Sequence, residues 1–222
     1  MLHKTRGIVF RFTKYGETSI IVNIFTELFG LQSYIVNGVR SKSSKNKIAL
    51  YQPLTLLDMV VYYRENANIN RIKELKCLHP YQSLSLEVKK SSMAMFIAEM
   101  INKTVREESH AHEVFEFLFQ SLVTLDGIQG EYENFHLVFL VKLSRFLGFG
   151  AHTIHEVLGG RMADIDIEKL LENLIQAEYE DRFTMTNPQR REVLELILKF
   201  YADHIDTLGE IKSVQVLREV LG

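Results

Sequence analysis

The sequence predicts a multidomain α+β protein, with a small five-stranded β-barrel followed by an α-helical bundle. Segments with the period of two that is typical of strands fill residues 1–80, whereas segments of helical period fill residues 81–222. Residues 1–80 carry 12 Lys and Arg against 5 Asp and Glu, a net of +7, and residues 81–222 carry 14 against 23, a net of −9. Both changes fall near Pro80, so we expect domains at 1–80 and 81–222.

Five short strands are expected in the first domain. In the first, Ile8, Phe10 and Phe12 alternate with Val9, Arg11 and Thr13. This alternation predicts a half-buried strand with one solvent-exposed face. The others are rich in β-branched residues or alternate in the same way, and the fifth is the weakest. The expected strands are 8–13, 18–26, 31–36, 54–64 and 69–77. Five such strands suit a partly closed barrel, and a stack of hairpins packed on the helices fits almost as well.

Apolar residues fall at helical spacing after Pro80. Phe135–Leu147 is apolar almost all round, so we expect it to be the buried central helix of a bundle, ending at Gly148. Asn187 is expected to cap a helix that starts at Pro188 and runs to Gly209. Further helices are expected around 93–105, 114–125, 167–175 and 213–221.

Composition narrows the class of protein. Of the 222 residues 46% are hydrophobic and 24% charged, which is ordinary for a folded domain. The longest apolar run, near 137–143, is too short to cross a bilayer and contains Lys142. The first residues do not resemble a secretory segment, so we expect a cytoplasmic location. The single cysteine, Cys77, excludes an internal disulfide and a cysteine-based zinc site.

A polar segment between the third and fourth strands carries four cations. Residues 28–57 contain no carboxylate, and their basic residues are Arg40, Lys42, Lys45 and Lys47. A loop with a cation every two or three residues suits a line of phosphates, because Lys and Arg gain affinity by releasing condensed counterions. The Ser and Asn residues between them can donate hydrogen bonds to phosphate oxygens. We therefore expect nucleic-acid binding; the alternatives are a solvated connection or an acidic protein partner.

Other residues of the first domain are expected to extend this basic surface across one face of the barrel. The cations are Arg11, Lys14, Arg64, Arg71 and Lys73. Exposed aromatic rings are the other requirement of single-strand binding, because bases stack on them. The candidates are Tyr15, Tyr34, Tyr62 and Tyr63. The alternative for each tyrosine is a place in the strand core with its hydroxyl at the surface.

Five segments of residues 7–64 occur in an order and spacing that resemble a known family. They are Gly7-Ile8-Val9, Tyr15-Gly16-Glu17-Thr18-Ser19, Phe25-Thr26-Glu27 with Gly30, Gly38-Val39-Arg40-Ser41-Lys42, and Leu50-Tyr51-Gln52-Pro53-Leu54. Together they are similar to the N-terminal domain of the RecO family, bacterial recombination mediators of DNA repair. Leu147-Gly148-Phe149-Gly150 and Ile211-Lys212-Ser213 are similar to later segments of that family.

The resemblance implies an oligonucleotide/oligosaccharide-binding (OB) barrel followed by a helical domain. It implies binding to single- and double-stranded DNA, strand annealing, and action with RecR to load RecA onto DNA coated by single-stranded-DNA-binding protein. The acidic C-terminal tail of that coating protein is implied to dock on the helical domain. By matching position, Arg40 and Lys42 are implied to contact DNA, whereas Lys45 and Lys47 rest on charge alone.

Many family members hold zinc with cysteines inserted after the Leu-Gly-aromatic-Gly helix. The equivalent stretch here, residues 151–186, contains no cysteine, so no zinc and no other cofactor is expected. The histidine pairs His110–His112 and His152–His155 are more typical of exposed positions than of metal ligands. No phosphate loop, nucleophile elbow or His-Glu-x-x-His helix is present, and we expect no enzymatic activity.

Lys142 and Arg145 lie three residues apart on the most apolar predicted helix, and so on one of its faces. An apolar groove rimmed by these cations is expected to hold an acidic peptide that ends in an aromatic residue. The alternative is a buried helix whose only polar face meets water. For the whole chain we expect a DNA-binding recombination mediator; the alternative is a protein adaptor whose basic loop binds an acidic protein.

Overall fold

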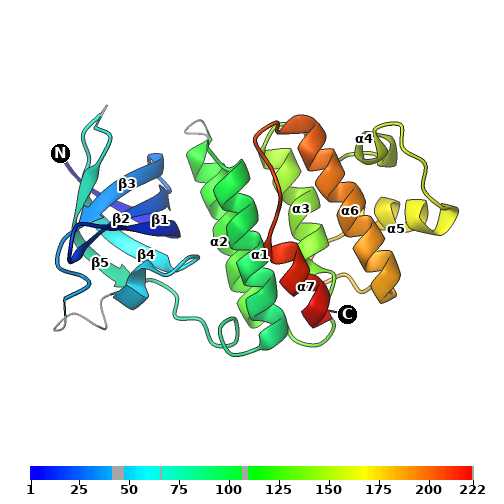
Figure 1. Cartoon of the computed structure of the whole chain (residues 1–222), viewed down its shortest axis with the longest axis horizontal. Helices are drawn as coiled ribbons and strands as arrows, with labels where there is room; N and C mark the ends of the chain where they lie inside the picture. Colours follow the sequence, from blue (N-terminus) through cyan, green and yellow to red (C-terminus); the bar gives the residue numbers. More distant parts are fainter. Residues whose placement is uncertain (42–47, 66, 107–109, 222) are drawn as a thin grey trace. The chain divides into compact units, whose positions relative to one another are not determined.

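The computed structural model (Figure 1) describes residues 1–41, 48–65, 67–106 and 110–221. They form two compact units, Met1–Tyr81 with Arg106–Val123, and Gln82–Val105 with Thr124–Gly222. By sequence the first unit carries 13 Lys and Arg against 9 Asp and Glu, a net of +4, and the second carries 13 against 19, a net of −6. The division of the chain into independent domains at 1–80 and 81–222 stays a prediction.

Five strands of the first unit close into a barrel (Figure 1). They are β1 (Leu2–Tyr15), β2 (Ser19–Thr26), β3 (Gly30–Val36), β4 (Leu56–Tyr62) and β5 (Asn70–Cys77), and their order around the barrel is β1-β2-β3-β5-β4. All pairs are antiparallel except β3 and β5, which pair in parallel at two positions only, Tyr34 with Asn70 and Ile35 with Arg71. A short 3-10 helix, η2 (Ile48–Tyr51), precedes β4. The OB-type barrel is confirmed, and the alternative of stacked hairpins is wrong.

The barrel interior is apolar and is built from alternate residues of each strand. It contains Val9, Ile20, Val22, Ile24, Tyr34, Leu57, Met59 and Val61. Only glycine fits at position 7, because a Cβ there would lie 2.7 Å from Cγ2 of Ile24. The simple alternation expected for the first strand is wrong, because a bulge between Val9 and Arg11 shifts the register. Phe12 packs against the interior, whereas Phe10 stacks on Phe25.

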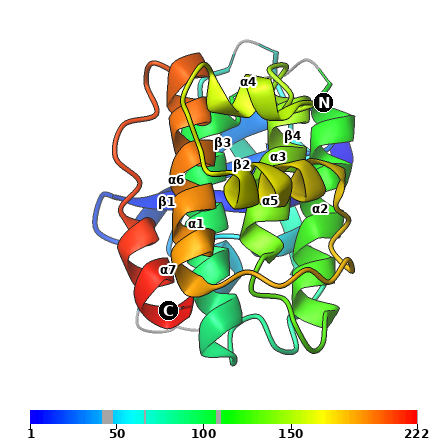
Figure 2. The ribbon, with the colours of Figure 1, turned by 90° about the vertical axis from the view of Figure 1, so that its right-hand side faces the viewer.

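Seven helices follow the barrel strands. They are α1 (Val88–Thr104), α2 (Ala111–Gly127), α3 (Phe135–Phe146), α4 (Ile154–Leu158), α5 (Ile165–Gln176), α6 (Asn187–His204) and α7 (Ser213–Leu221). In the second unit α3 packs on α1, α5 and α6, and Figure 2 shows α5 crossing α3 with α6 beside them. Nine of the 12 residues of α3 are buried, so the expected central helix is confirmed. Among the described residues, no helix combines the length and the apolar character needed to span a bilayer.

Two helix predictions need correction. The cap of α6 is Thr186 rather than Asn187, because the Thr186 hydroxyl accepts from the N–H of Gln189 while the Gln189 side chain accepts from the N–H of Thr186. The helix ends at His204 and not at Gly209. Helix α4, which is not among the helices expected from the sequence, is capped in the same way by Thr153. Its five residues are too few for a helical period to be recognised.

Candidate nucleic-acid interface

A band of outward-facing side chains crosses all five strands of the barrel. Residues that pair across neighbouring strands point to the same face, so the register defines its members. They are Thr13 and Leu2 on β1, Ile21 on β2, Ile35 on β3, Arg71 on β5 and Tyr62 on β4. We call these six residues the outer band. The band begins and ends on β1, because barrel strands are staggered.

Arg71 of the outer band also lines a hollow of about 320 Å³ beside the short seam between β3 and β5. Lys73, Asn37 and Tyr51 line the same hollow. Asn37 directly follows β3, and Tyr51 is the last residue of η2. Both ends of the segment that carries the basic loop therefore lie at this hollow. The loop cations Lys42, Lys45 and Lys47 lie outside the described residues.

Arg40 lies against the turn between β1 and β2. Its backbone N–H donates to the Thr18 carbonyl at 2.9 Å, and its guanidinium donates to the Gly16 carbonyl at 3.2 Å. Lys14, at the end of β1, is exposed beside this turn. The Ser19 hydroxyl donates to the Asn37 side chain at 3.1 Å, which joins the turn to the hollow. The structure therefore brings Arg40 and Lys14 to the same end of the barrel as the base of the basic loop.

The other two predicted cations are also exposed. Arg11 faces outward on β1 opposite Asn23, two residues from Thr13 of the outer band. Arg64 precedes β5, and its N–H donates to the Asn70 side chain at 3.1 Å, next to Arg71. Lys73 lies 3.4 Å from the Glu74 carboxylate, whereas Arg11, Lys14, Arg40, Arg64 and Arg71 form no ion pair with another described residue. Their charges are therefore available to a ligand.

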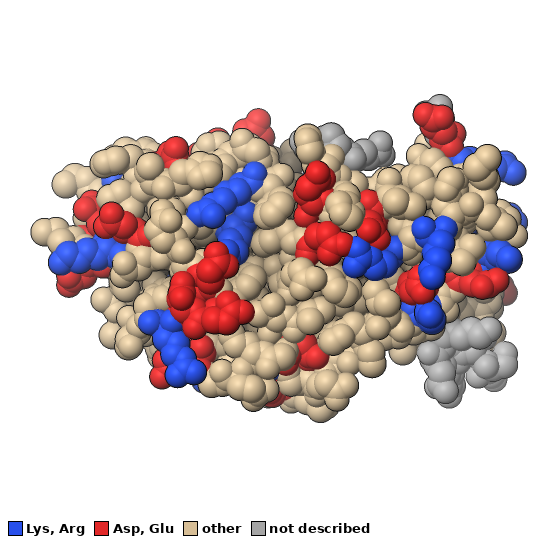
Figure 3. All heavy atoms as spheres, turned by 180° about the vertical axis from the view of Figure 1, so that it is seen from behind, with Lys and Arg blue, Asp and Glu red and all other residues tan. Residues whose placement is uncertain are grey.

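The basic residues do not form one unbroken patch. Glu17, Glu65 and Glu74 are exposed on the same unit. On the face of the molecule drawn in Figure 3, basic and acidic side chains are interleaved. Affinity for a polyanion must therefore come from local groups of cations rather than from a uniformly basic face.

Burial separates the four candidate tyrosines. Tyr34 is 0% exposed inside the barrel, and this burial raises the pKa of its hydroxyl. Tyr63 stacks on Phe29 with ring centroids 3.9 Å apart. Tyr15 is 52% exposed and Tyr62 is 46% exposed. Only these last two of the four candidates have rings open to a ligand.

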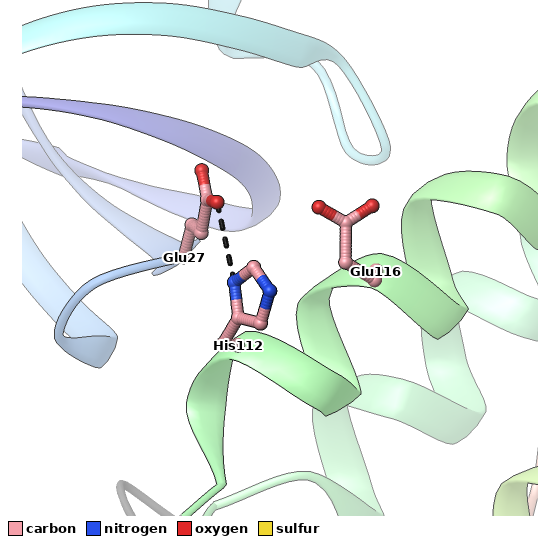
Figure 4. A group of neighbouring side chains, drawn as sticks. All are labelled: Glu27, His112 and Glu116. Carbon is pink, nitrogen blue, oxygen red and sulfur yellow. Dashed lines mark ion pairs between the residues drawn. The ribbon is translucent and has the colours of Figure 1, made fainter.

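A second cluster of the first unit joins β1, the β2–β3 turn and α2. Figure 4 shows Glu27, His112 and Glu116 side by side, with Nδ1 of His112 3.2 Å from Glu27. The Arg6 guanidinium donates to Glu27 at 2.8 and 2.9 Å and also to Glu116, and it lies over the Phe115 ring. The hydrogen bond from Arg6 lowers the pKa of Glu27. Because Arg6 forms ion pairs with both carboxylates, the cluster links β1, the β2–β3 turn and α2 within the first unit.

The sequence did not reveal this cluster. Arg6 and Glu116 are 110 positions apart, and their spacing contains no signal that α2 returns to the barrel. The expectation that the chain binds no metal stays a prediction.

Lys142 and Arg145 lie together on α3, as predicted. Nζ of Lys142 is 2.6 Å from the Glu178 carboxylate and lies over the Tyr179 ring. The Arg145 guanidinium donates to the Ile175 carbonyl at 2.5 Å. Both cations thus contact the end of α5 and the residues after it. Binding of an acidic peptide at this pair stays a prediction.

Comparison with known proteins shows the family. Residues 1–81 match the family model described as Recombination protein O N terminal, and residues 86–166 match the one described as Recombination protein O C terminal. Proteins named DNA repair protein RecO from Bacteroides fragilis and Phocaeicola vulgatus are 35% and 34% identical to this chain, each over 99% of both chains. That of Flavobacterium psychrophilum is 32% identical over 98% of both.

This chain belongs to the RecO family of DNA repair proteins. The resemblance drawn from the short segments of residues 7–64 is confirmed, and so is the OB barrel followed by helices that it implied. The barrel carrying the outer band coincides with the N-terminal RecO match.

The cysteine zinc site that the resemblance implied for many RecO proteins does not fit this chain. Residues 151–186 contain no cysteine, and Cys77 is exposed on β5 in the other unit. In that stretch α4 is fixed instead by its Thr153–Glu156 capping box and by the burial of Val157 and Leu158. Packing and capping hold this part of the fold together.

Proposed function

We propose that this RecO-family chain is a non-enzymatic recombination mediator that binds single- and double-stranded DNA and anneals complementary strands. In this role it acts with RecR to load RecA onto DNA coated by single-stranded-DNA-binding protein. The observation that carries the proposal is the gathering of cations that form no ion pair with a described residue around one end of an OB barrel in a DNA repair family. A cytoplasmic location follows from this role.

The DNA contact is proposed to be made by two groups of cations together with the basic residues that follow Arg40 in the sequence. Arg40 and Lys14 form one group at the β1–β2 turn, and Arg71 with Arg64 forms the other at the start of β5. Lys42, Lys45 and Lys47 continue from Arg40, and Arg11 extends the surface along β1. Contacts of this kind neutralise phosphates without reading bases, so two strands of any sequence can be held together.

The second unit is proposed to dock the acidic tail of the coating protein at Lys142 and Arg145. The tail's carboxylates would replace Glu178 on Lys142, because that ion pair is made by a glutamate whose side chain is 67% exposed. An exposed pair of this kind contributes little stability, so its exchange for a peptide carboxylate costs little.

Charge reversal in the basic loop tests the proposed function. The double variant Lys42→Glu with Lys45→Glu removes two phosphate contacts, so we expect affinity for single strands and duplexes to fall roughly tenfold or more at moderate salt. The slope of log affinity against log salt should become shallower by about 2. Anisotropy of labelled oligonucleotides measures both quantities. Annealing of complementary strands precoated with the binding protein should slow in parallel.

The matched control reverses two exposed lysines of the second unit, Lys169→Glu with Lys199→Glu, and so changes the net charge equally. We expect it to keep the DNA affinity of the unaltered protein within about twofold, because these cations do not contact the strands. Equal losses in both variants would show only a nonspecific charge effect. If the unaltered protein binds no oligonucleotide, the adaptor function, with an acidic protein on the loop, replaces the mediator.

A further inference from the structure

We propose that Tyr62 is a base-stacking platform that makes the barrel favour single-stranded over double-stranded DNA, with Arg71 beside it on the phosphate. The inference rests on the proposed function and deepens it, because it assigns to one residue the ability to distinguish an unpaired strand from a duplex.

The position of Tyr62 in the outer band supports this assignment. Tyr62 pairs in register with Leu2 on one side and with Arg71 on the other, so the three side chains stand in a row on the outside of the barrel. Tyr62 and Leu2 are each 46% exposed, and Arg71 is exposed as well. An aromatic ring, an aliphatic chain and a guanidinium in one row offer a surface for a base and a charge for its phosphate.

The fold itself does not require an exposed ring at position 62. The next residue, Tyr63, packs against the barrel interior and stacks on Phe29, so it supplies the aromatic contact of this strand end. The structure gives the Tyr62 hydroxyl no hydrogen bond to another described residue. A large ring that is 46% exposed leaves apolar surface in water, which is an arrangement expected of a ligand contact.

Charge favours nucleic acid as the occupant. Arg71 and Arg64 are the nearest cations along β5 and the β4–β5 connection, and neither forms an ion pair with a described residue. A duplex hides the faces of its bases within the stack, so it can use these arginines but not the Tyr62 ring. An unpaired strand can use both, because every base has a π face.

The test compares Tyr62→Leu, which removes the ring and keeps an apolar side chain, with Tyr62→Phe, which keeps the ring and removes the hydroxyl. Anisotropy is measured with one labelled oligonucleotide, single-stranded and annealed to its complement, over a range of salt. We expect Tyr62→Leu to weaken single-strand binding roughly tenfold and to leave duplex binding within about twofold. Its salt slope should not change, because no phosphate contact is lost. Tyr62→Phe should bind as the unaltered protein does.

Several outcomes would overturn the inference. Unchanged single-strand affinity in Tyr62→Leu would remove Tyr62 from the contact. An equal loss on duplex would indicate an effect on the fold or on backbone binding, and a loss in Tyr62→Phe would indicate the hydroxyl. Loss of RecR binding with both DNA affinities intact would make the band a protein interface. If the unaltered protein binds neither DNA form, it is the proposed function that fails, and that result is distinct from all of these.

Discussion

At the scale of single residues, Lys90 is a buried cation with several oxygen partners in the second unit. Its side chain is 0% exposed, and Nζ donates to the Ser83 hydroxyl at 2.7 Å and to the carbonyls of Asp126 and Ile128 at 3.0 and 2.8 Å. The ammonium also lies 3.4 Å from Glu87. A buried charge with this number of acceptors fixes the segment before α1 against the end of α2.

Replacing Lys90 tests this contact. Lys90→Met keeps the length of the side chain but leaves buried oxygens without a donor, so we expect the free energy of unfolding to fall by roughly 3 kcal/mol. Urea unfolding followed by circular dichroism measures the change. The matched control is Lys89→Met, whose side chain is 47% exposed and which pairs with Glu133, and it should lose less than about 1 kcal/mol. Equal losses in the two variants would contradict the role of Lys90.

The candidate site shows how far single residues can be read from a sequence. The exposure of Arg11, Lys14 and Arg71 was predictable, because long charged side chains on strands and loops point to water wherever the fold permits. The tyrosines were not, because the exposed fraction of a strand residue depends on its register. Tyr62 faces out and Tyr63 faces in, and a shift of one position would exchange them.

At the scale of elements, α7 is held by a carboxylate of α1. Glu99 accepts hydrogen bonds from the N–H of Lys212 at 3.0 Å and from the N–H and hydroxyl of Ser213 at 2.7 and 2.6 Å. Burial alone would raise the pKa of Glu99, but these hydrogen bonds outweigh it and lower the pKa below its ordinary value of 4.5. The start of α7, which carries the Ile211-Lys212-Ser213 segment, thus depends on a charged partner.

This dependence predicts an effect of pH. Because the pKa is lower in the folded state, ionised Glu99 stabilises the fold above about pH 4.5, and that stability is lost as the pH falls through the folded pKa. Glu99→Gln should lower the free energy of unfolding by roughly 1 to 2 kcal/mol at pH 7, and the difference should shrink toward zero in acid. Urea unfolding at pH 7 and pH 3 measures it. The exposed control Glu172→Gln should stay within about 0.5 kcal/mol of the unaltered protein at pH 7.

Elements were predicted well where their pattern is long. The 12 residues of α3 and the alternation of β4 each span enough positions to show their period. The bulge in β1 and the five-residue α4 were missed for the opposite reason, since one extra residue or one helical turn leaves no periodic trace. The cap of α6 was misplaced by one residue, because Thr186 and Asn187 are both good capping residues and only the contact with Gln189 decides between them.

At the scale of the whole molecule, the barrel and the first part of α2 form one compact unit. The residues that connect them in the sequence, Gln82–Val105, belong to the other unit. Arg6 makes the connection through Glu116 and the rings of Phe115 and Phe119. A fragment of residues 1–81 contains the five strands of the described barrel but lacks these partners. The change in hydrophobic period near Pro80 marks the end of the strands. This compact unit also includes residues Arg106–Val123, which follow later in the chain.

We expect the fragment 1–81 to be less stable than the same barrel in the intact chain. Without Glu116 and the two rings, Arg6 and the apolar surface around it meet water, so the amides of β1 and β2 should exchange with solvent roughly tenfold faster or more. Hydrogen exchange on the fragment and on the whole protein compares them directly. The intact variant Glu116→Gln separates the ion pair from the packing, and its effect should be smaller. Equal protection in fragment and intact chain would show that the barrel is independent of α2.

The short ladder between β3 and β5 has a mechanical consequence. Two residue pairs join these strands, whereas β1 is joined to β2 and β4 over most of its length. Separation of β3 from β5 breaks few backbone hydrogen bonds and leaves the long antiparallel ladders intact. We therefore expect β3 and β5 to separate transiently. The barrel wall would then widen beside Arg71, while the other strand pairs keep their register.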